Sequence, residues 1–241
     1  MNELPRVVKR KINHLLGSVL GYEIRRRDKS FENRYVWLRS MGIRTVIDIG
    51  ANEGQFARIA LDLFPGAKLC CFEPLADCCK ILAELGREHK GITVFPYACG
   101  ETSDEVSMNR SSFSPSSSLL EMGSRHKELY PFSSDSSQEL VSVRRLDDLV
   151  GDIPFERPIL IKVDVQGFEN RVIRGGVNTF ATASVVIIEV SFETLYKEQA
   201  SFDSVYQLLV STGFHFRGLA QQDADPNTGI PIYADAYFLR G

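Results

Sequence analysis

The stretch Thr45-Val-Ile-Asp-Ile-Gly-Ala-Asn-Glu-Gly54 decides the fold of this 241-residue chain. Its first half, residues 45–49, has the apolar pattern of a short buried strand. Two glycines lie in the second half, and a helical pattern follows from Glu53 onward. A buried strand that runs through a glycine-containing loop into a helix is typical of open α/β sheets, in which ligands bind beyond the carboxyl ends of the strands.

Outward from this stretch, strand and helix patterns alternate along the chain. Further strands are predicted at residues 68–72, 92–95, 158–163, 184–188, 214–219 and 233–239. Helices are predicted at residues 53–64, 75–87, 168–174 and 202–211. This alternation indicates a parallel sheet with helices on both faces. No helix separates the last two strands, so we expect them to pair antiparallel at one edge.

Charge is unevenly distributed. The chain has 28 Lys and Arg against 31 Asp and Glu, a net charge of −3, which gives no sign of nucleic-acid binding. Residues 1–40 carry +6 and the remainder carries −9. This split predicts a basic N-terminal extension, residues 1–40, on an acidic domain of residues 41–241.

The extension is predicted to be helical. Residues 4–20 place apolar side chains at helical spacing, and a second helix is expected at residues 31–41. The apolar stripe favours packing on the domain or on a second subunit. The alternative is that residues 1–30 bind a membrane surface or a partner protein.

The cysteines indicate a reducing environment. Five of them crowd into thirty residues: Cys70, Cys71, Cys78, Cys79 and Cys99. Neighbouring cysteines do not pair easily with each other, and an odd number does not fit a disulfide framework. We therefore expect reduced thiols in a cytoplasmic protein, with peripheral membrane attachment through the basic helix as the alternative. The sequence shows no apolar run of about 20 residues, the length needed to span a membrane.

Residues 101–157 interrupt the alternation. A connection of this length is far longer than a usual crossover. It contains Ser111-Ser-Phe-Ser-Pro-Ser-Ser-Ser118, followed by Leu119, Leu120 and Met122, which give it apolar side chains to bury. This insert is therefore interpreted as a substrate lid over the active site rather than as a mobile polar linker.

The glycine loop has the chemistry of a site for a cationic ligand. A dinucleotide site would have the pattern Gly-x-Gly-x-x-Gly, whereas the spacing here is Gly50-x-x-x-Gly54. Asp48, beside the loop, would repel a pyrophosphate but suits the sulfonium and ammonium groups of S-adenosylmethionine. A nucleotide-dependent oxidoreductase is therefore the second hypothesis, and a non-catalytic module that keeps the fold is the third.

A second acidic position follows the next predicted strand. Glu73, in Phe72-Glu-Pro74, comes 19 residues after Gly54, where a carboxylate can accept hydrogen bonds from both ribose hydroxyls. The alternative is that Glu73 only complements the dipole of the helix that follows. Its place at a strand end favours the ribose role.

A third group of polar residues ends the strand at residues 158–163. In Lys162-Val-Asp-Val-Gln-Gly-Phe-Glu169, the side chains of Asp164, Gln166 and Glu169 lie within one loop-to-helix turn. They either position a substrate, with Asp164 accepting a proton from an attacking hydroxyl, or cap the following helix. The sequence leaves both interpretations open.

In this order, the motifs resemble those of the FkbM-type S-adenosylmethionine-dependent methyltransferases. The residues that carry the resemblance are Asp48-Ile-Gly-Ala-Asn-Glu-Gly54, Phe72-Glu-Pro74, Tyr97-Ala-Cys-Gly100, Ser118-Leu119, Ile161-Lys-Val-Asp-Val-Gln-Gly-Phe-Glu169 and Gly175-Gly176. The resemblance covers about residues 44–240. It implies the Rossmann-like class I methyltransferase fold, an α/β fold with a seven-stranded, mostly parallel sheet whose last strand is antiparallel. It also implies methylation of hydroxyls on sugars, polyketides or other secondary metabolites.

The resemblance assigns roles by position. Contacts with S-adenosylmethionine are implied for Asp48, Gly50, Asn52, Gly54, Glu73, Pro74 and Ala98, of which Ala98 would border adenine. Contacts with a small-molecule or glycan acceptor are expected from Ser118, Gln166 and Glu169. Asp164 would face the reacting methyl group.

Methyl transfer to a hydroxyl is favoured by a general base, because a hydroxyl is a poor nucleophile until it is deprotonated. Asp164 is the first candidate for the base, and His126 in the insert is the second. A divalent metal is the alternative, and Asp164 and Glu189 each end a predicted strand with hard oxygen ligands. Two carboxylates do not complete a metal site, so the sequence leaves the metal open.

Overall fold

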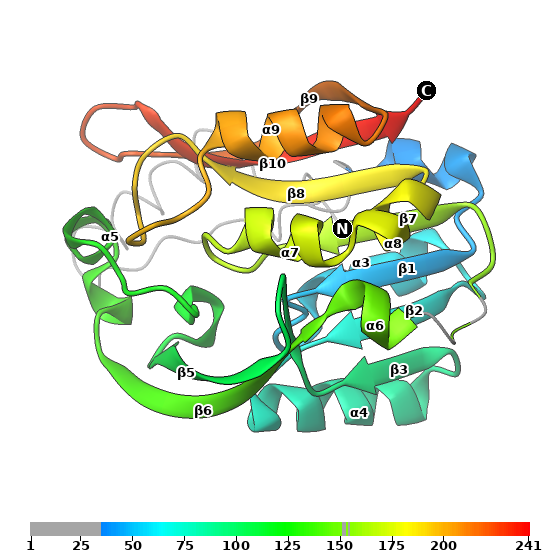
Figure 1. Cartoon of the computed structure of the whole chain (residues 1–241), viewed down its shortest axis with the longest axis horizontal. Helices are drawn as coiled ribbons and strands as arrows, with labels where there is room; N and C mark the ends of the chain where they lie inside the picture. The colour runs from blue at the N-terminus through cyan, green and yellow to red at the C-terminus, as the bar shows by residue number, and fades with distance from the viewer. Residues whose placement is uncertain (1–34, 151–152, 154) are drawn as a thin grey trace, which may run out of the picture. The chain divides into compact units, whose positions relative to one another are not determined.

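The computed structural model describes residues 35–150, 153 and 155–241. Within this part of the chain, a seven-stranded sheet has the order β3-β2-β1-β7-β8-β10-β9 (Figure 1). Its strands are β1 (Thr45–Ile49), β2 (Lys68–Phe72), β3 (Ile92–Phe95), β7 (Ile159–Val163), β8 (Val185–Ser191), β9 (Phe214–Ala224) and β10 (Pro231–Arg240). Only β10 runs antiparallel to its neighbours, β8 and β9. The predicted fold class is confirmed, including the antiparallel pairing of the last two strands.

The central strands are buried on both faces. All five residues of β1 and all five of β7 are buried, which explains why both strands are almost continuously apolar. Each large aliphatic side chain removed from water there contributes about 1.5–3 kcal/mol to folding. The two polar exceptions at the middle of the sheet are Asp48 and Lys162, which lie opposite each other in the register of β1 and β7.

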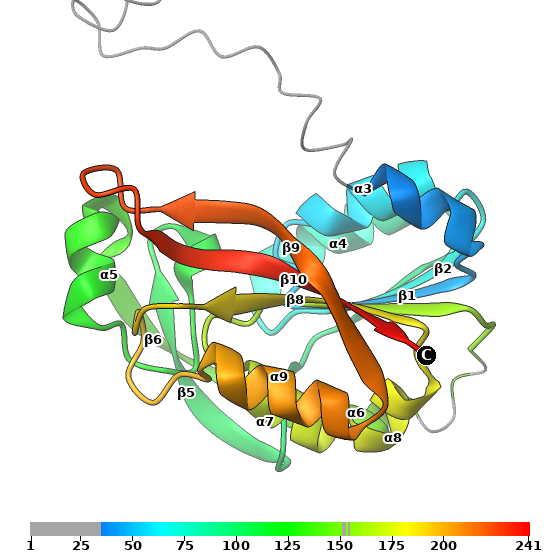
Figure 2. The ribbon, with the colours of Figure 1, turned by 90° about the horizontal axis from the view of Figure 1, so that it is seen from above.

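Helices cover the two faces of the sheet, as Figure 2 shows. One face is covered by α3 (Gln55–Leu63) and α4 (Ala76–Glu88), and the other by α6 (Leu146–Val150), α7 (Glu169–Gly175), α8 (Val177–Thr182) and α9 (Phe202–Ser211). The predicted helix at residues 168–174 ends near Gly176 as expected. Helix α8, which was not predicted, begins directly afterwards and buries Phe180 completely in the core.

The insert has more regular structure than its sequence indicates. Within it and just before it lie β4 (Ala98–Gly100), β5 (Asp104–Ser111), η2 (Ser114–Ser116), α5 (Ser124–Leu129), η3 (Pro131–Ser133) and β6 (Ser136–Arg145). The three strands form a second sheet of order β4-β6-β5. Most residues of β5 and β6 are exposed or half-buried, so these strands lack the apolar pattern by which the other strands were predicted.

The parallel strands of the main sheet point toward the side of the domain on which α5 lies, in both views of the ribbon (Figures 1 and 2). This arrangement places the insert next to the carboxyl ends of β1, β2 and β7. The edge of the sheet at which ligands bind in open α/β folds is therefore the edge that the insert borders.

The N-terminal prediction concerns a separate part of the chain. Residues Trp37–Gly241 form one unit, and residues 1–34 lie outside the described part of the chain. The helix predicted at residues 4–20 lies outside the described residues. Of the helix predicted at residues 31–41, the described part is a 3-10 helix, η1 (Val36–Met41). The described chain contains no helix with the length and apolar character needed to cross a bilayer. All five cysteines are free thiols, and only Cys79 is not fully buried.

Candidate functional site

Carboxylates from four strands gather at the carboxyl edge of the main sheet. Asp48 lies in β1, Glu73 follows β2, Asp164 follows β7, and Glu189 lies near the end of β8. Because β1, β2, β7 and β8 are parallel, residues distant in sequence meet at this edge. The sequence motifs are thus brought together in one place.

The glycine loop lies between the ends of β1 and β7. Gly50 has φ +80°, and a Cβ atom at this position would lie 1.9 Å from the carbonyl oxygen of Asp164. Only glycine allows this approach of the two strand ends. Asn52, also with positive φ, donates its backbone N–H to Glu73 Oε2 over 2.8 Å. The loop is therefore fixed to the ends of both neighbouring strands, and Gly54 begins α3 immediately after it.

Asp48 has an unsatisfied carboxylate oxygen. Its side chain is buried, and Oδ2 has no hydrogen-bond partner among the described residues. Burial raises the pKa of Asp48 to about 7, and the nearby ammonium of Lys162 only partly opposes this effect. An unpartnered buried acceptor is costly, and a positive charge placed beside it would stabilise its ionised form. This position therefore fits a cationic ligand such as S-adenosylmethionine.

Glu73 is held by backbone groups on both carboxylate oxygens. Oε1 accepts the N–H of Leu75 and Oε2 accepts the N–H of Asn52, each over 2.8 Å. Burial raises the pKa of Glu73 to about 7. Each carboxylate oxygen has a further lone pair, so these bonds leave capacity for ribose hydroxyls. The contact with Leu75, just before α4, agrees with the alternative interpretation that Glu73 complements a helix start, and the two roles are compatible.

Two further positions predicted to contact the cofactor, Pro74 and Ala98, have no polar side chain and could contact it only through main-chain or apolar groups. Pro74 is half-buried and directly follows Glu73. Ala98 is buried at the start of β4, where it pairs with Val143 of β6. A contact of Ala98 with adenine would therefore involve main-chain or methyl groups, and this role stays a prediction.

Asp164 is more accessible than the buried Asp48 and Glu73. Its side chain is 37% exposed, and Oδ2 lies 3.4 Å from the ammonium of Lys162. Lys162 is itself almost fully buried and also donates to Asp235 Oδ1 over 2.9 Å. Neither Lys162 nor Asp235 was among the predicted site residues. A charged residue in the otherwise apolar strand Tyr233-Ala-Asp-Ala-Tyr237 was the available signal for Asp235.

A single amide group bridges Asp164 and Glu189. Gln166 Nε2 donates to Asp164 Oδ1 over 2.8 Å and to Glu189 Oε1 over 3.1 Å. Desolvation and the neighbouring carboxylates raise the pKa of Glu189 well above its usual range. The predicted pair of metal ligands is thus close together, with an amide between its members. Across the described ranges, no group of three or more His, Cys, Asp or Glu side chains is placed to hold a metal ion.

Two of the predicted substrate residues bond the loop after β7. Glu169 Oε1 accepts the backbone N–H groups of Val165 and Gly167, over 3.3 and 3.1 Å, while burial raises its pKa to about 7. These contacts hold the loop before α7, and no side chain caps the start of that helix. Ser118 Oγ donates to the carbonyl oxygen of Gln166 over 2.7 Å. Contacts of both residues with an acceptor stay predictions.

His126 lies inside α5 and is 3% exposed. Its Nε2 atom lies 3.1 Å from the hydroxyl of Tyr196, and Nδ1 has no hydrogen-bond partner in the described structure. Burial lowers the pKa of His126, so the ring is neutral at neutral pH. Tyr196, in the loop after β8, was not identified from the sequence, because an isolated tyrosine in a loop carries no motif.

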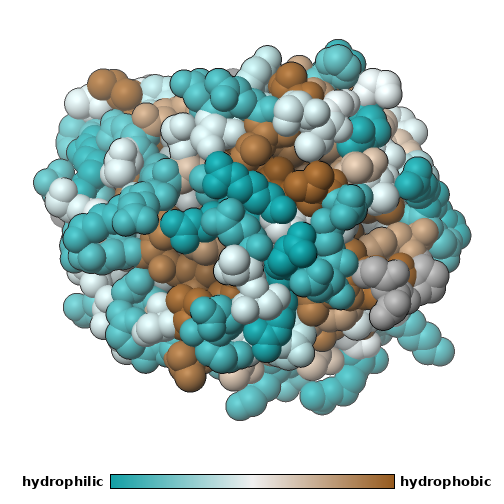
Figure 3. All heavy atoms as spheres, viewed as in Figure 1, coloured by the Kyte–Doolittle hydropathy of each residue, from teal (hydrophilic) through white to brown (hydrophobic). Residues whose placement is uncertain are grey.

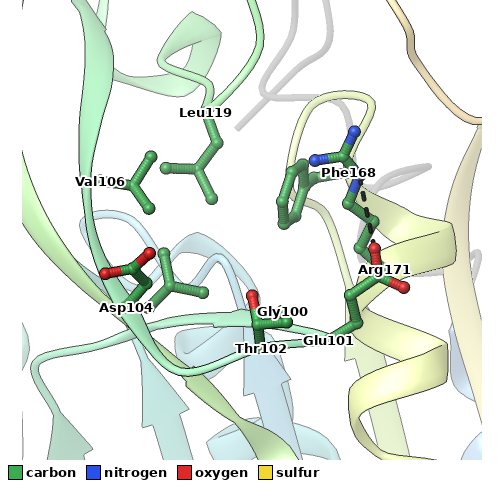
Figure 4. Close-up of a pocket in the computed structure, with 9 residues that line it drawn as sticks. Gly100, Glu101, Thr102, Asp104, Val106, Leu119, Phe168 and Arg171 are labelled. Atoms are coloured by element: carbon green, nitrogen blue, oxygen red, sulfur yellow. Dashed lines mark ion pairs between the residues drawn. The ribbon is translucent and has the colours of Figure 1, made fainter.

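A pocket on the domain is lined by residues that neighbour several of the predicted site residues along the chain, such as Leu119 beside Ser118 and Phe168 beside Glu169. Figure 4 shows the ring of Phe168 and the side chains of Leu119 and Val106 facing a common space, with an ion pair between Arg171 and Glu101 at its border. The pocket is lined by Gly100, Glu101, Thr102, Asp104, Val106, Leu119, Val143, Phe168 and Arg171. None of the predicted site residues is among them. In the surface view of Figure 3, hydrophobic residues are interspersed with hydrophilic ones on this face.

The chain is similar to known proteins along most of its length. The domain described as methyltransferase FkbM matches residues 48–216. The 2-O-methyltransferase NoeI of Sinorhizobium fredii (strain NBRC 101917 / NGR234) is 30% identical over 176 residues, which are 69% of this chain and 71% of that protein. Methyltransferase 1 of Beauveria bassiana (strain ARSEF 2860) is 25% identical over 142 residues, 54% of this chain and 57% of that protein.

Solved structures show weaker similarity. Magnesium protoporphyrin IX methyltransferase of Synechocystis PCC 6803, crystallised with bound S-adenosylmethionine, superposes with a TM-score of 0.48 at 10% identity, covering 100% of both chains. Precorrin-6y C5,15-methyltransferase of Geobacter metallireducens GS-15 also gives 0.48, at 9% identity, covering 89% of this chain and 91% of the other. The sequence matches, and not these superpositions, decide the family.

Proposed function

The chain belongs to the FkbM methyltransferase family, and from this premise we propose that it uses S-adenosylmethionine to methylate a hydroxyl of a saccharide or saccharide-containing metabolite. The observation that carries the proposal is the accessible carboxylate of Asp164 at an edge where Asp48 and Glu73 are buried. The similarity to a protein named as a 2-O-methyltransferase supports oxygen as the methylated atom. Nothing at the site favours the nucleotide-dependent oxidoreductase.

The buried carboxylates are suited to hold the cofactor. When bound, S-adenosylmethionine supplies an electrophilic methyl group on a positively charged sulfur. Asp48, with its unpartnered oxygen, stabilises positive charge beside the glycine loop. Glu73 accepts ribose hydroxyls with its remaining lone pairs, while its bonds to Asn52 and Leu75 keep the carboxylate in place. These contacts hold and orient the ligand, and neither carboxylate takes part in the transfer of the methyl group.

Asp164 is the better candidate for the base. It is accessible, and its two oxygens are held by Lys162 and Gln166, so its position is fixed before an acceptor binds. From there it accepts the proton of the attacking hydroxyl as the oxygen–methyl bond forms. His126 is less suited to this role, because it is buried within α5 and its Nε2 contacts Tyr196.

The insert supplies the acceptor side of the site. Ser114 Oγ donates to Asn52 Oδ1 over 3.2 Å, which ties the serine-rich segment to the cofactor loop. Next to Ser114, Phe113 is 45% exposed and lies edge-to-face with Phe132, which is 64% exposed. Exposed aromatic rings among serine hydroxyls suit a sugar, which has apolar C–H faces and polar edges. This surface supports a saccharide acceptor and the interpretation of the insert as a lid.

The proposal is tested with the full-length protein. Isothermal titration is expected to detect binding of S-adenosylmethionine and S-adenosylhomocysteine. A screen of saccharide and glycolipid acceptors, read by mass spectrometry, is expected to find a product heavier by one methyl group. Asp164→Asn should lower kcat about 100-fold or more and leave cofactor affinity within about twofold. Cofactor binding without transfer to any acceptor would favour the non-catalytic module instead.

A further inference from the structure

The hydroxyl of Tyr196 joins segments that are far apart in the sequence. The ring is buried in the loop after β8. Its Oη atom lies 3.1 Å from the carbonyl oxygen of Ser116, 3.0 Å from Gln166 Oε1 and 3.1 Å from His126 Nε2. Ser116 and His126 belong to the insert, whereas Gln166 belongs to the loop after β7. One hydroxyl therefore connects the insert with the loop that carries Asp164.

The side-chain amide of Gln166 has one favourable orientation. Its Nε2 group donates to carboxylate oxygens of both Asp164 and Glu189. If the amide were turned over, its carbonyl oxygen would face Oδ1 of Asp164 and the hydrogen bond to this carboxylate would be lost. Oε1 therefore faces Tyr196. The backbone of Gln166 has φ 55°, which is uncommon for a residue with a Cβ atom and recurs at functional sites.

The single hydroxyl proton of Tyr196 determines the tautomer of His126. The carbonyl oxygen of Ser116 and Gln166 Oε1 can only accept hydrogen bonds. If His126 Nε2 were also an acceptor, three acceptors would compete for one proton. With the proton on Nε2, the imidazole donates to Tyr196 Oη, and only two acceptors, the carbonyl oxygen of Ser116 and Gln166 Oε1, share the hydroxyl proton. The unprotonated atom is then Nδ1, the one that lacks a partner in the described structure.

We propose that Tyr196 is a positioning residue of the methyltransferase site. Its hydroxyl fixes the amide of Gln166, and this amide holds the carboxylate of Asp164. Because Ser116 and His126 share the same hydroxyl, docking of the insert and alignment of Asp164 are coupled. The inference rests on the proposed role of Asp164 and extends it to a residue that no sequence motif includes.

The hydrogen-bond network is tested by NMR of the full-length protein labelled with 15N-histidine. The four histidines of the chain are His14, His89, His126 and His215, so the spectrum is simple to assign by single substitutions. Long-range 15N–1H correlations distinguish the two neutral tautomers. His126 is expected as the Nε2–H form at neutral pH, and Tyr196→Phe should shift its nitrogen signals. An Nδ1–H form, or signals unchanged by Tyr196→Phe, would overturn the inference.

A matched control is Tyr206→Phe in α9, whose side chain is exposed and lies away from the network. This variant removes the same hydroxyl oxygen from a tyrosine and should leave the signals of His126 unchanged. A shift in both variants would mean that the His126 signals do not report on Tyr196, which counts against the network.

The positioning role is tested by kinetics with an acceptor found in the screen. Tyr196→Phe and Gln166→Ala should each lower kcat about 10- to 100-fold, with KM for S-adenosylmethionine changed by less than about twofold. Because they act through the same carboxylate, the double variant should lose no more than Gln166→Ala alone. Additive losses, or an unchanged kcat in Tyr196→Phe, would refute positioning. The NMR result needs no acceptor, so a failure of methyl transfer with the expected His126 signals would refute the proposed function and not the network.

Discussion

At the scale of single residues, the site is dominated by carboxylates whose burial opposes ionisation. Asp48, Glu73 and Glu169 each have a pKa raised to about 7 by burial. Each is thus protonated more readily in the folded chain than in the unfolded one. For such a group, stability is lost as the pH rises from the unfolded pKa, about 4, through the folded value of about 7. The burial of these three carboxylates therefore lowers the stability of the fold at neutral pH.

Asp48→Asn tests this effect of burial directly. Asparagine keeps the shape but removes the buried charge, so the melting temperature at pH 8 should rise by several degrees. Binding of S-adenosylmethionine at pH 8 should weaken at least about tenfold, because the ligand loses its anionic partner. Differential scanning fluorimetry and isothermal titration measure the two effects. Asp48 ionises between pH 6 and 8, so the affinity of the wild-type protein for S-adenosylmethionine should rise over this range. The part of this rise that depends on Asp48 should be absent in the variant. A lower melting temperature at pH 8 would contradict this account.

Glu73→Ala should affect both binding and folding. It removes the expected acceptor for ribose and leaves the backbone N–H groups of Asn52 and Leu75 without their bonds. We expect the affinity for S-adenosylmethionine to fall more than about tenfold and the free energy of unfolding to fall by about 1–3 kcal/mol. Titration calorimetry and urea unfolding measure the two quantities. Glu84→Ala, on the exposed side of α4, is the control and should change neither. Unchanged binding in a folded Glu73→Ala variant would exclude the ribose role.

At the scale of elements, the insert links parts of the site that the sheet alone would leave separate. Its serine-rich segment contacts the glycine loop at Asn52, while Ser118 contacts the loop after β7. Helix α5 is fastened by Arg125, which pairs with Glu193 after β8 and with Asp225 after β9. The insert is therefore attached to loops from several strands and is well placed to select the acceptor.

Phe132→Ala tests whether the exposed rings of the insert bind the acceptor. The substitution removes a ring that lies 5.3 Å from that of Phe113 and is mostly in water, so the fold should change little. KM for a saccharide acceptor should rise about tenfold, because an aromatic stacking contact is worth about 0.5–1.5 kcal/mol beyond its area. The affinity for S-adenosylmethionine should stay the same. Leu140→Ala, an exposed apolar residue of β6, is the control. Equal KM values in both variants would contradict a role of the two rings in binding the acceptor.

In the chain as a whole, the excess of basic residues and the candidate site residues lie in different segments of the sequence. Every candidate site residue lies between Asp48 and Asp235, and the excess of positive charge lies in residues 1–40. The proposed chemistry therefore requires only the acidic domain. The basic extension is available for a separate role, for which the sequence favours packing or dimerisation over binding to a membrane surface.

Deletion of residues 1–30 should leave cofactor affinity within about twofold of wild type, because no candidate contact to the cofactor is removed. Titration of the truncated chain with S-adenosylmethionine measures this. Co-sedimentation with phosphatidylserine vesicles then tests the membrane alternative, which predicts salt-sensitive binding of the full-length chain only. Equal pelleting of both forms would eliminate that alternative. Loss of cofactor binding on truncation would contradict the assignment of the site to the domain.

The strands of the main sheet, the order of the elements along the chain and the glycine loop were predicted from the sequence. Buried strands such as residues 45–49 and 159–163 are continuously apolar, and the polar residues that interrupt or follow them lie where ligands bind. These signals are local, so a single sequence carries them. The strands β5 and β6 were missed because their exposed residues follow no apolar pattern.

Only the tertiary structure decided which residues meet. It placed Tyr196 between His126 and Gln166, and it placed Lys162 between Asp164 and Asp235. Apart from the local pair Lys162 and Asp164, these partners come from different strands, loops and the insert, so no spacing along the chain encodes their contacts. It also showed that Gly50 is required by the carbonyl group of Asp164, more than a hundred residues later. Local patterns fix elements through backbone propensity and burial, whereas the site arises from long-range packing, which becomes visible only when the elements are assembled.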